Sequence, residues 1–175
     1  MVSANELLTK RKPMVIGIAL ALILISWLCW YFSDKQVIKR QLIGLSWEIG
    51  KKNRQESTME TALKMREVKA VLADNCTLVV PERNKYAESV ERDMAIIYLM
   101  HYRDRYEVLT VTFEEMDITF PAKGEAVVQS KVVLQKQTGQ PPPAEVTAPV
   151  KLTMKKQDGD WLLTQAEVAA ALLDN

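Results

Sequence analysis

The chain has 175 residues, of which 23 are Lys or Arg and 22 are Asp or Glu, so its formal net charge is +1. A nucleic-acid-binding protein needs a concentrated basic face, and this near-balance indicates no nucleic-acid partner. The two cysteines form neither a disulfide framework nor a metal-ligand spacing, and we expect no metal and no cofactor.

The first feature along the chain is an uncharged, apolar run over residues 14–32. A helix of this length crosses a bilayer core of about 30 Å, so the run predicts a transmembrane helix. Basic residues come before it, and aromatic residues, which favour the membrane–water interface, lie at its far end. The residues expected at the two interfaces are Lys10, Arg11, Lys12, Trp27, Trp30 and Tyr31.

The run is interpreted as a retained anchor because its end is too bulky for signal-peptide cleavage. The tail over residues 1–13 is short and basic, which favours a signal anchor in an inner or plasma membrane with the carboxyl-terminal domain outside the cytoplasm. Gly17 and Ala21 form a small-xxx-small pair. That pair is either a contact between two helices or ordinary membrane-helix composition.

Three helices are expected next. Residues 33–56 form a juxtamembrane helix and linker, helical over 34–54, whose basic residues either rest on anionic headgroups or form a solvated helix face. Ser57 and Glu60 resemble a capping box that opens a second helix and a domain over residues 57–175. A third helix is expected from about Tyr86 to Tyr102, after a short strand. The apolar face of the second helix is expected to be Leu63, Val68, Val71 and Leu72, and that of the third to be Val90, Met94, Ile97, Tyr98 and His101.

After Arg105 the apolar period changes from 3.6 to 2, which is typical of strands. The parity of alternation reverses at Glu114–Glu115, which indicates either a β-bulge in one long strand or two separate strands. Further strands are expected over 126–135, 146–155 and 161–168, with a tight turn at Asp158-Gly159 and a short carboxyl-terminal helix. This order predicts an α+β fold, with three helices packed on a curved, mainly antiparallel sheet.

Two stretches resemble the nuclear transport factor 2-like superfamily. The sequence of residues 72–79, LADNCTLV, is similar to the superfamily's FADD-hydrophobic strand signature. The sequence of residues 155–163, KKQDGDWLL, is similar to its last hairpin. The resemblance covers roughly residues 40–168 and implies a cone, in which a curved sheet wraps around helices and encloses a pocket.

The layout of an anchor followed by such a domain also resembles the bitopic inner-membrane subunits of type IV secretion machines, in which the domain is a scaffold. Enzymes of the superfamily, such as ketosteroid isomerases and dehydratases, place an acid–base carboxylate or histidine inside the cone. His101 is the one histidine here, and it is interpreted either as a hydrogen-bonded core or rim residue or as a pocket base with Tyr98 as donor. Asp117 is expected to face solvent, so no second catalytic member is found.

Two functions follow. The first is a non-catalytic, membrane-anchored interaction or scaffold module that binds the lipid bilayer through its anchor and a protein partner or a second copy through its domain. The alternative is a pocket protein that binds or transforms a small apolar molecule. The candidate pocket residues are Met94, Tyr98, His101 and Tyr102. Trp47, on the first helix, is expected to be core or helix-packing surface.

Overall fold

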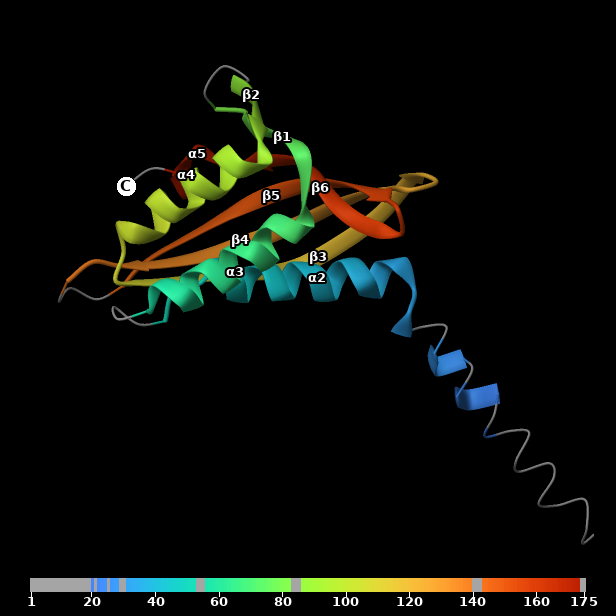
Figure 1. Ribbon diagram of the computed structural model, residues 1–175. Coiled ribbons are helices and arrows are strands. Elements are labelled where there is room, and N and C mark those ends of the chain that lie inside the picture. The colour runs from blue at the N-terminus through green and yellow to red at the C-terminus, as the bar shows by residue number, and fades with distance from the viewer. Residues whose placement is uncertain are drawn as a thin grey trace, which may run out of the picture. The chain divides into compact units, whose positions relative to one another are not determined.

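The protein is described from a computed structural model (Figure 1). It describes Leu20, residues 22–24, 26–28, 31–52, 56–82, 86–139 and 143–173. Contacts divide the chain into two compact units, Met1–Ile38 and Lys39–Asn175.

In the first unit, the described residues from Leu20 to Leu28 are helical and exposed, and the rings of Trp27 and Tyr31 stack at 5.4 Å. No helix in the described part of the chain is long and apolar enough to cross a membrane. Most of the predicted anchor lies outside the described residues. So do four of its expected interface residues, Lys10, Arg11, Lys12 and Trp30.

The second unit contains a curved, mixed sheet of six strands, with strand order β2-β1-β6-β5-β4-β3. All neighbouring strands are antiparallel except β1 and β6, which run parallel. The predicted α+β class with a mainly antiparallel sheet is therefore confirmed. The strands are β1 (Leu72–Val80), β2 (Tyr86–Glu91), β3 (Val108–Ala122), β4 (Glu125–Gln137), β5 (Ala144–Gln157) and β6 (Asp160–Val168).

The longest strand, β3, is a single strand with a bulge. Its register against β4 shifts between Glu114 and Asp117, and Glu115 has a φ of 50°. The buried hydroxyl of Ser130 donates a 2.6 Å hydrogen bond to the Glu114 carbonyl, so the bulge is supported from the neighbouring strand. Of the two sequence interpretations, the bulge is confirmed. Asp117 is exposed, as predicted.

The last hairpin joins β5 and β6 through Asp158 and Gly159, whose φ angles are 53° and 100°. Two successive residues with positive φ match the twist of the strands that they join, and Asp-Gly is a preferred pair for this turn. The predicted tight turn is confirmed. It places Trp161, which is 2 % exposed, at the start of β6.

The helices are α2 (Asp34–Ile49), α3 (Thr58–Val71), α4 (Arg92–Asp104) and α5 (Ala170–Leu173). In Figure 1, α3 and α4 cross one face of the sheet. The buried face of α2 carries Leu42 and Leu45, and Gln41 Nε2 donates a 2.8 Å hydrogen bond to the Trp161 carbonyl on β6. The helix ends at Ile49, five residues before the expected end. Gly50 follows, and because it has no side chain the backbone comes close to β3, where Lys51 pairs with Leu109.

The predicted start of α3 is confirmed, since Ser57 is the N-cap and its hydroxyl accepts a 3.1 Å hydrogen bond from the Glu60 amide. The predicted apolar face of α3 was wrong at Leu63, which is 51 % exposed, although Val68 and Leu72 are buried. The expected start of the third helix was also wrong. Tyr86–Glu91 forms β2, because these residues pair with Asn75–Val80 of β1.

Candidate functional site: the outer face of α4

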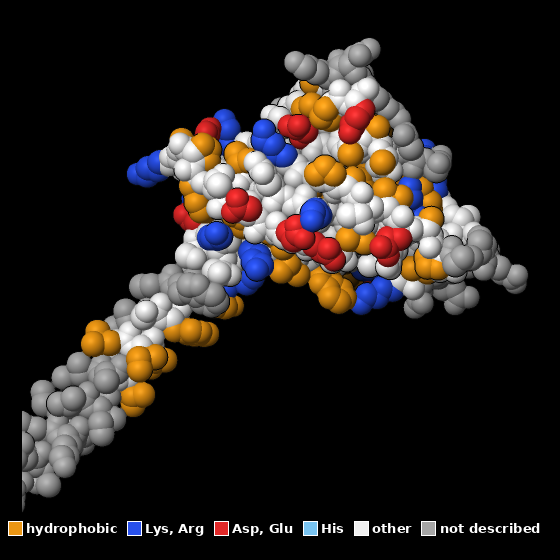
Figure 2. All heavy atoms as spheres, turned by 180° about the vertical axis from the view of Figure 1, so that it is seen from behind, with side chains coloured by type: hydrophobic (Ala, Val, Ile, Leu, Met, Phe, Trp, Pro, Cys, Tyr) orange, Lys and Arg blue, Asp and Glu red, His pale blue; other side chains and the backbone are white. Residues whose placement is uncertain are grey.

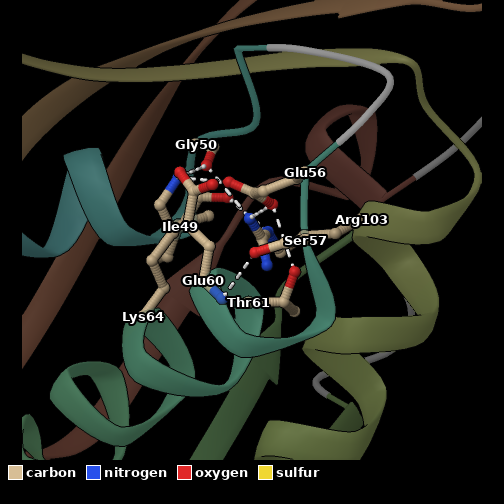
Figure 3. Close-up of polar contacts among 8 residues, drawn as sticks. All are labelled: Ile49, Gly50, Glu56, Ser57, Glu60, Thr61, Lys64 and Arg103. Carbon is tan, nitrogen blue, oxygen red and sulfur yellow. Dashed lines mark hydrogen bonds and ion pairs between the residues drawn. The ribbon is translucent and has the colours of Figure 1, made fainter.

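A buried arginine anchors α4 near its carboxyl end. Arg103 is 2 % exposed, and its Nε donates a 2.9 Å hydrogen bond to the Ile49 carbonyl. Its Nη2 donates to the Gly50 carbonyl at 3.1 Å and to Glu56 Oε2 at 2.7 Å. Arg103 therefore joins the carboxyl end of α2, the segment before α3, and α4 (Figure 3).

A second cation completes this cluster. Lys64 Nζ bonds to Glu56 Oε1 and lies 3.4 Å from the Gly50 carbonyl oxygen. Thr61 Oγ1 lies 3.4 Å from Glu56 Oε2. Burial by itself raises the pKa of Glu56, but the hydrogen bond from Lys64 and the charges of Arg103 and Lys64 outweigh burial, and its pKa is lowered from 4.5. Glu56 is therefore held as the carboxylate that these two cations require.

Arg103 lies on the inward side of α4 together with the partly buried Ala95, Ile96, Leu99 and Tyr102, and the opposite side faces outward. Met94, Ile97 and Tyr98 are 40 %, 43 % and 52 % exposed, and Met100 is 38 % exposed. His101 is also exposed, and its Nδ1 lies 2.8 Å from the Ile97 carbonyl oxygen, one turn back. The expectation that Met94, Ile97, Tyr98 and His101 form the buried face was therefore wrong. The inward side is made instead of Ala95, Ile96, Leu99, Tyr102 and Arg103. We call Met94, Ile97, Tyr98, Met100 and His101 the α4 outer face.

The fourth predicted site residue, Tyr102, is more buried than the other three. It is half-buried, its hydroxyl donates a 3.0 Å hydrogen bond to the Leu172 carbonyl, and its ring meets Tyr106 edge-on at 5.3 Å. Burial raises the pKa of Tyr102 well above its usual range. Met94, Tyr98 and His101, in contrast, lie on the exposed side of the helix.

Two large apolar residues of α3 are exposed as well. On α3, Met59 is 75 % exposed and Leu63 is 51 % exposed. The two helices are joined at one end by the ion pair between Lys69 and Asp93, at 2.6 Å, and at the other by the pair between Arg103 and Glu56. The two helices are therefore linked near both ends, and each exposes large apolar side chains. Exposed apolar surface, where it is contiguous, marks interaction sites.

An apolar groove lies elsewhere, between α2 and the outer edge of β3. Its volume is about 300 Å³. Trp47, expected to be core or helix-packing surface, is 58 % exposed here, and Lys52 Nζ lies 4.1 Å from the centre of its ring. Figure 2 shows hydrophobic side chains along the lower margin of the domain, the level at which α2 runs in Figure 1. The groove is lined by Ile43, Ser46, Trp47, Gly50, Lys52 and residues 109–113.

No group of three or more His, Cys, Asp or Glu side chains in the described residues is arranged to hold a metal ion. Cys76 is half-buried, and its Sγ lies 3.0 Å from the Leu163 carbonyl oxygen. Burial raises the pKa of this thiol, which keeps it protonated and unreactive. Cys76 is therefore a packing residue of the sheet.

Sequence reasoning did not find Arg103 or Glu56. Each was one charge among many in polar segments, and nothing local distinguishes a buried charge from a solvated one. The available signal was indirect. Arg103 lies on the opposite side of the helix from Met94, Ile97 and Tyr98. Burying those three residues would therefore have turned Arg103 toward solvent.

Comparisons with protein-family models and with curated proteins found no match. Solved structures do match. The association domain of CaMKII from C. elegans is 12 % identical, with a TM-score of 0.58 over 80 % of this chain and 98 % of that one. An NTF2-like protein of unknown function from Shewanella oneidensis MR-1 is 17 % identical, with a TM-score of 0.54 over 77 % of this chain and 98 % of that one.

A protein of Novosphingobium aromaticivorans, provisionally named a scytalone dehydratase, is 18 % identical, with a TM-score of 0.61 over 77 % of this chain and 82 % of that one. At 12 % to 18 % identity these three matches show a common fold and carry no activity over to this chain. The chain therefore carries a domain with the nuclear transport factor 2-like, or cystatin-like, fold.

Proposed function

We propose that this protein is a non-catalytic interaction module, held at a membrane by residues 14–32, that binds a protein through the α4 outer face. The single observation that carries the proposal is the exposure of Met94, Ile97 and Tyr98 on one side of α4. Fully exposing such a stripe costs roughly 25 cal/mol for each Å² of apolar surface. Such a stripe stays exposed in the single chain where a partner covers it in the complex.

The anchor is supported by the uncharged run over residues 14–32 and by the stacked rings of Trp27 and Tyr31 at its end. Aromatic rings at such an end suit the membrane–water interface. We further propose that the domain lies outside the cytoplasm. A reporter fused after Asn175, active on one side of the membrane only, tests this. Activity inside the cytoplasm would contradict the orientation.

A non-catalytic role is supported by the surroundings of His101. Its ring is exposed and its Nδ1 faces the Ile97 carbonyl of its own helix. Asp117 is exposed on β3. An acid–base pair works within hydrogen-bond reach of a common substrate in a site that excludes water, and these exposed positions favour binding over catalysis.

Photo-cross-linking in intact membranes tests the proposed function. The photoreactive residue p-benzoylphenylalanine replaces Tyr98 in one variant and Thr147, which is exposed on β5, in a control. We expect protein adducts from position 98 that are absent from position 147. Adducts at neither position, or adducts of position 98 to lipid alone, would contradict a protein-binding face.

The groove beside β3 favours a second candidate, a binding site for a small apolar molecule. It is open, lined mostly by apolar side chains, and bordered by the indole of Trp47. Lauric acid is a suitable probe, because binding there would change the fluorescence of Trp47. A Trp47→Phe variant that binds the probe equally well but loses the signal would support this candidate. No saturable change in the unaltered protein would dismiss it.

A further inference from the structure

We infer that the free edge of β3 over residues 109–113 binds an extended peptide segment of another protein, which joins the sheet as an antiparallel strand. We call this stretch the β3 edge. β3 is the last strand of the sheet, and the groove of about 300 Å³ separates its free edge from α2 (Figure 1). The inference goes beyond the proposed function, because it assigns a second binding site away from the α4 outer face.

The backbone of the β3 edge points outward at alternate residues. The N–H of Leu109 donates to the Lys51 carbonyl at 2.8 Å, and the Leu109 carbonyl accepts from the Lys51 N–H at 2.7 Å. Both main-chain groups of Leu109 therefore face away from β4. In an antiparallel ladder this direction recurs at every second residue, so the main-chain groups of Val111 and Phe113 also face outward.

These outward groups are open to pairing. In the described part of the chain, Lys51 is the only residue that pairs with β3 on this side, and it pairs with Leu109 alone. Val111 and Phe113 therefore each present one N–H and one C=O next to the groove. A segment that runs in the same direction as Lys51 would extend the ladder by two residue pairs.

The sequence of β3 protects the rest of its edge but not this stretch. Edge strands avoid unwanted pairing through charged side chains, prolines and bulges. The sequence of residues 109–113, LTVTF, contains no charge and no proline, and the strand is regular there. The bulge at Glu114–Glu115 follows directly, and Asp117 and Pro121 come after it. The unprotected stretch is the same one that lines the groove.

The groove indicates which side chains the bound segment carries. Residues that are opposite each other in neighbouring strands place their side chains on the same face of the sheet. Val111 and Phe113 are half-buried on the face that Leu109 shares, so the two segment residues opposite them point into the groove. Thr112 is exposed, and the segment residue between those two points outward with it. The expected pattern is therefore apolar, polar, apolar.

The outward main-chain groups argue against a purely apolar ligand in the groove. An acyl chain that covered Val111 and Phe113 would remove water from two N–H and two C=O groups and return no hydrogen bond, which is costly. An extended peptide replaces each of those bonds while its apolar side chains fill the groove. The combination of an open edge and an apolar groove therefore favours a peptide.

The test is an NMR titration of the isotope-labelled full chain in dodecyl maltoside with the peptide acetyl-Lys-Val-Thr-Val-Ser. We expect saturable shifts and slower hydrogen exchange at the amides of Val111 and Phe113, with millimolar affinity. Methylation of either valine nitrogen of the peptide is expected to weaken binding about tenfold, because those N–H groups donate to β3. Methylation of the threonine nitrogen is the matched control. That N–H points away from β3, so binding is expected to stay nearly unchanged.

A protein variant gives an independent readout. Val111→Pro removes one outward N–H and leaves the pairing with β4, since proline is tolerated where the N–H of an edge strand faces solvent. We expect it to lose peptide binding with an unchanged circular dichroism spectrum. No binding of the peptide, or binding that neither valine methylation nor Val111→Pro weakens, would overturn the inference. Binding of lauric acid without binding of the peptide would also overturn it and assign the groove to a small apolar molecule. Photo-cross-links from position 98 test the α4 outer face separately.

Discussion

The Nη2 atom of Arg103 lies 2.7 Å from Oε2 of Glu56, and the two side chains are 2 % and 7 % exposed. This ion pair joins residues 47 positions apart and holds the inward side of α4 to the segment before α3. Ala95, Ile96 and Leu99 share that inward side. The candidate binding face lies on the opposite side of the helix.

Removing one partner of this pair is expected to be costly. Arg103→Met leaves Glu56 buried beside a single cation, and breaking a buried pair costs about 3–5 kcal/mol. Urea unfolding of the full chain in detergent, followed by tryptophan fluorescence, measures the loss. The double variant Glu56→Leu with Arg103→Met is expected to lose less than the two single variants added together, because neither charge is then left alone. Additive losses would show that the two side chains do not interact.

The pH dependence of stability has a definite sign. The pKa of Glu56 is lowered in the folded protein, so its contribution is present above the ordinary value of 4.5 and is lost as the pH falls through the lower, folded value. We expect the urea midpoint to fall between about pH 5 and pH 3 more in the unaltered chain than in Glu56→Gln. Asp93 also has a lowered pKa, through Lys69, but it is fully exposed and salt screens it. Equal slopes in the two proteins at high salt would contradict the assignment to Glu56.

The bulge in β3 is expected to depend on Ser130. Ser130→Ala removes the buried hydroxyl that donates to the Glu114 carbonyl, and losing such a hydrogen bond costs about 0.5–1.5 kcal/mol. Thr119→Ala is the matched control, since its hydroxyl lies 3.4 Å from the Val127 carbonyl oxygen at an exposed position, and we expect a change within about 0.5 kcal/mol. Thermal unfolding compares the two. A loss in Thr119→Ala as large as that in Ser130→Ala would mean that the bulge does not need this bond.

Neighbouring residues on α2 are expected to differ sharply. Leu42 is fully buried, whereas Ile43 is 41 % exposed. Leu42→Ala is expected to cost about 2–5 kcal/mol through the lost contacts and the cavity left behind. Ile43→Ala is expected to cost less than about 1 kcal/mol, which urea unfolding resolves. Similar costs at both positions would show that α2 packs with a different face.

Local signals in the sequence predicted much of the fold. Asp158-Gly159 identified the last turn, Ser57 the start of α3, and the change in parity at Glu114–Glu115 the bulge, because each depends on residues close together in the chain. The segment Tyr86–Glu91 did not follow its helical period, since pairing with β1 satisfies its backbone more effectively. Such pairing depends on residues brought close by the rest of the fold.

The candidate site was less predictable than the fold. Residues 94–100 of α4 are all apolar, so the sequence does not say which side of the helix is buried. In the structure Arg103 lies on the inward side, where it donates to two carbonyls at the end of α2 and to a carboxylate before α3. These acceptors lie about fifty residues away in sequence. The residues Met94, Tyr98 and His101 were singled out as a possible pocket, and the structure places them on an outer surface instead.

Oxidation of two methionines tests the central claim most directly. Met94 and Met100 belong to the α4 outer face and are 40 % and 38 % exposed in the single chain. Mass spectrometry would measure their rates of oxidation by hydrogen peroxide in intact membranes and in chain diluted in detergent to a monomer. If a protein covers this face, both residues oxidise several-fold more slowly in the membrane, and buried Met154 stays protected in both samples. Equal rates for Met94 and Met100 in the two samples would contradict an interaction role for α4.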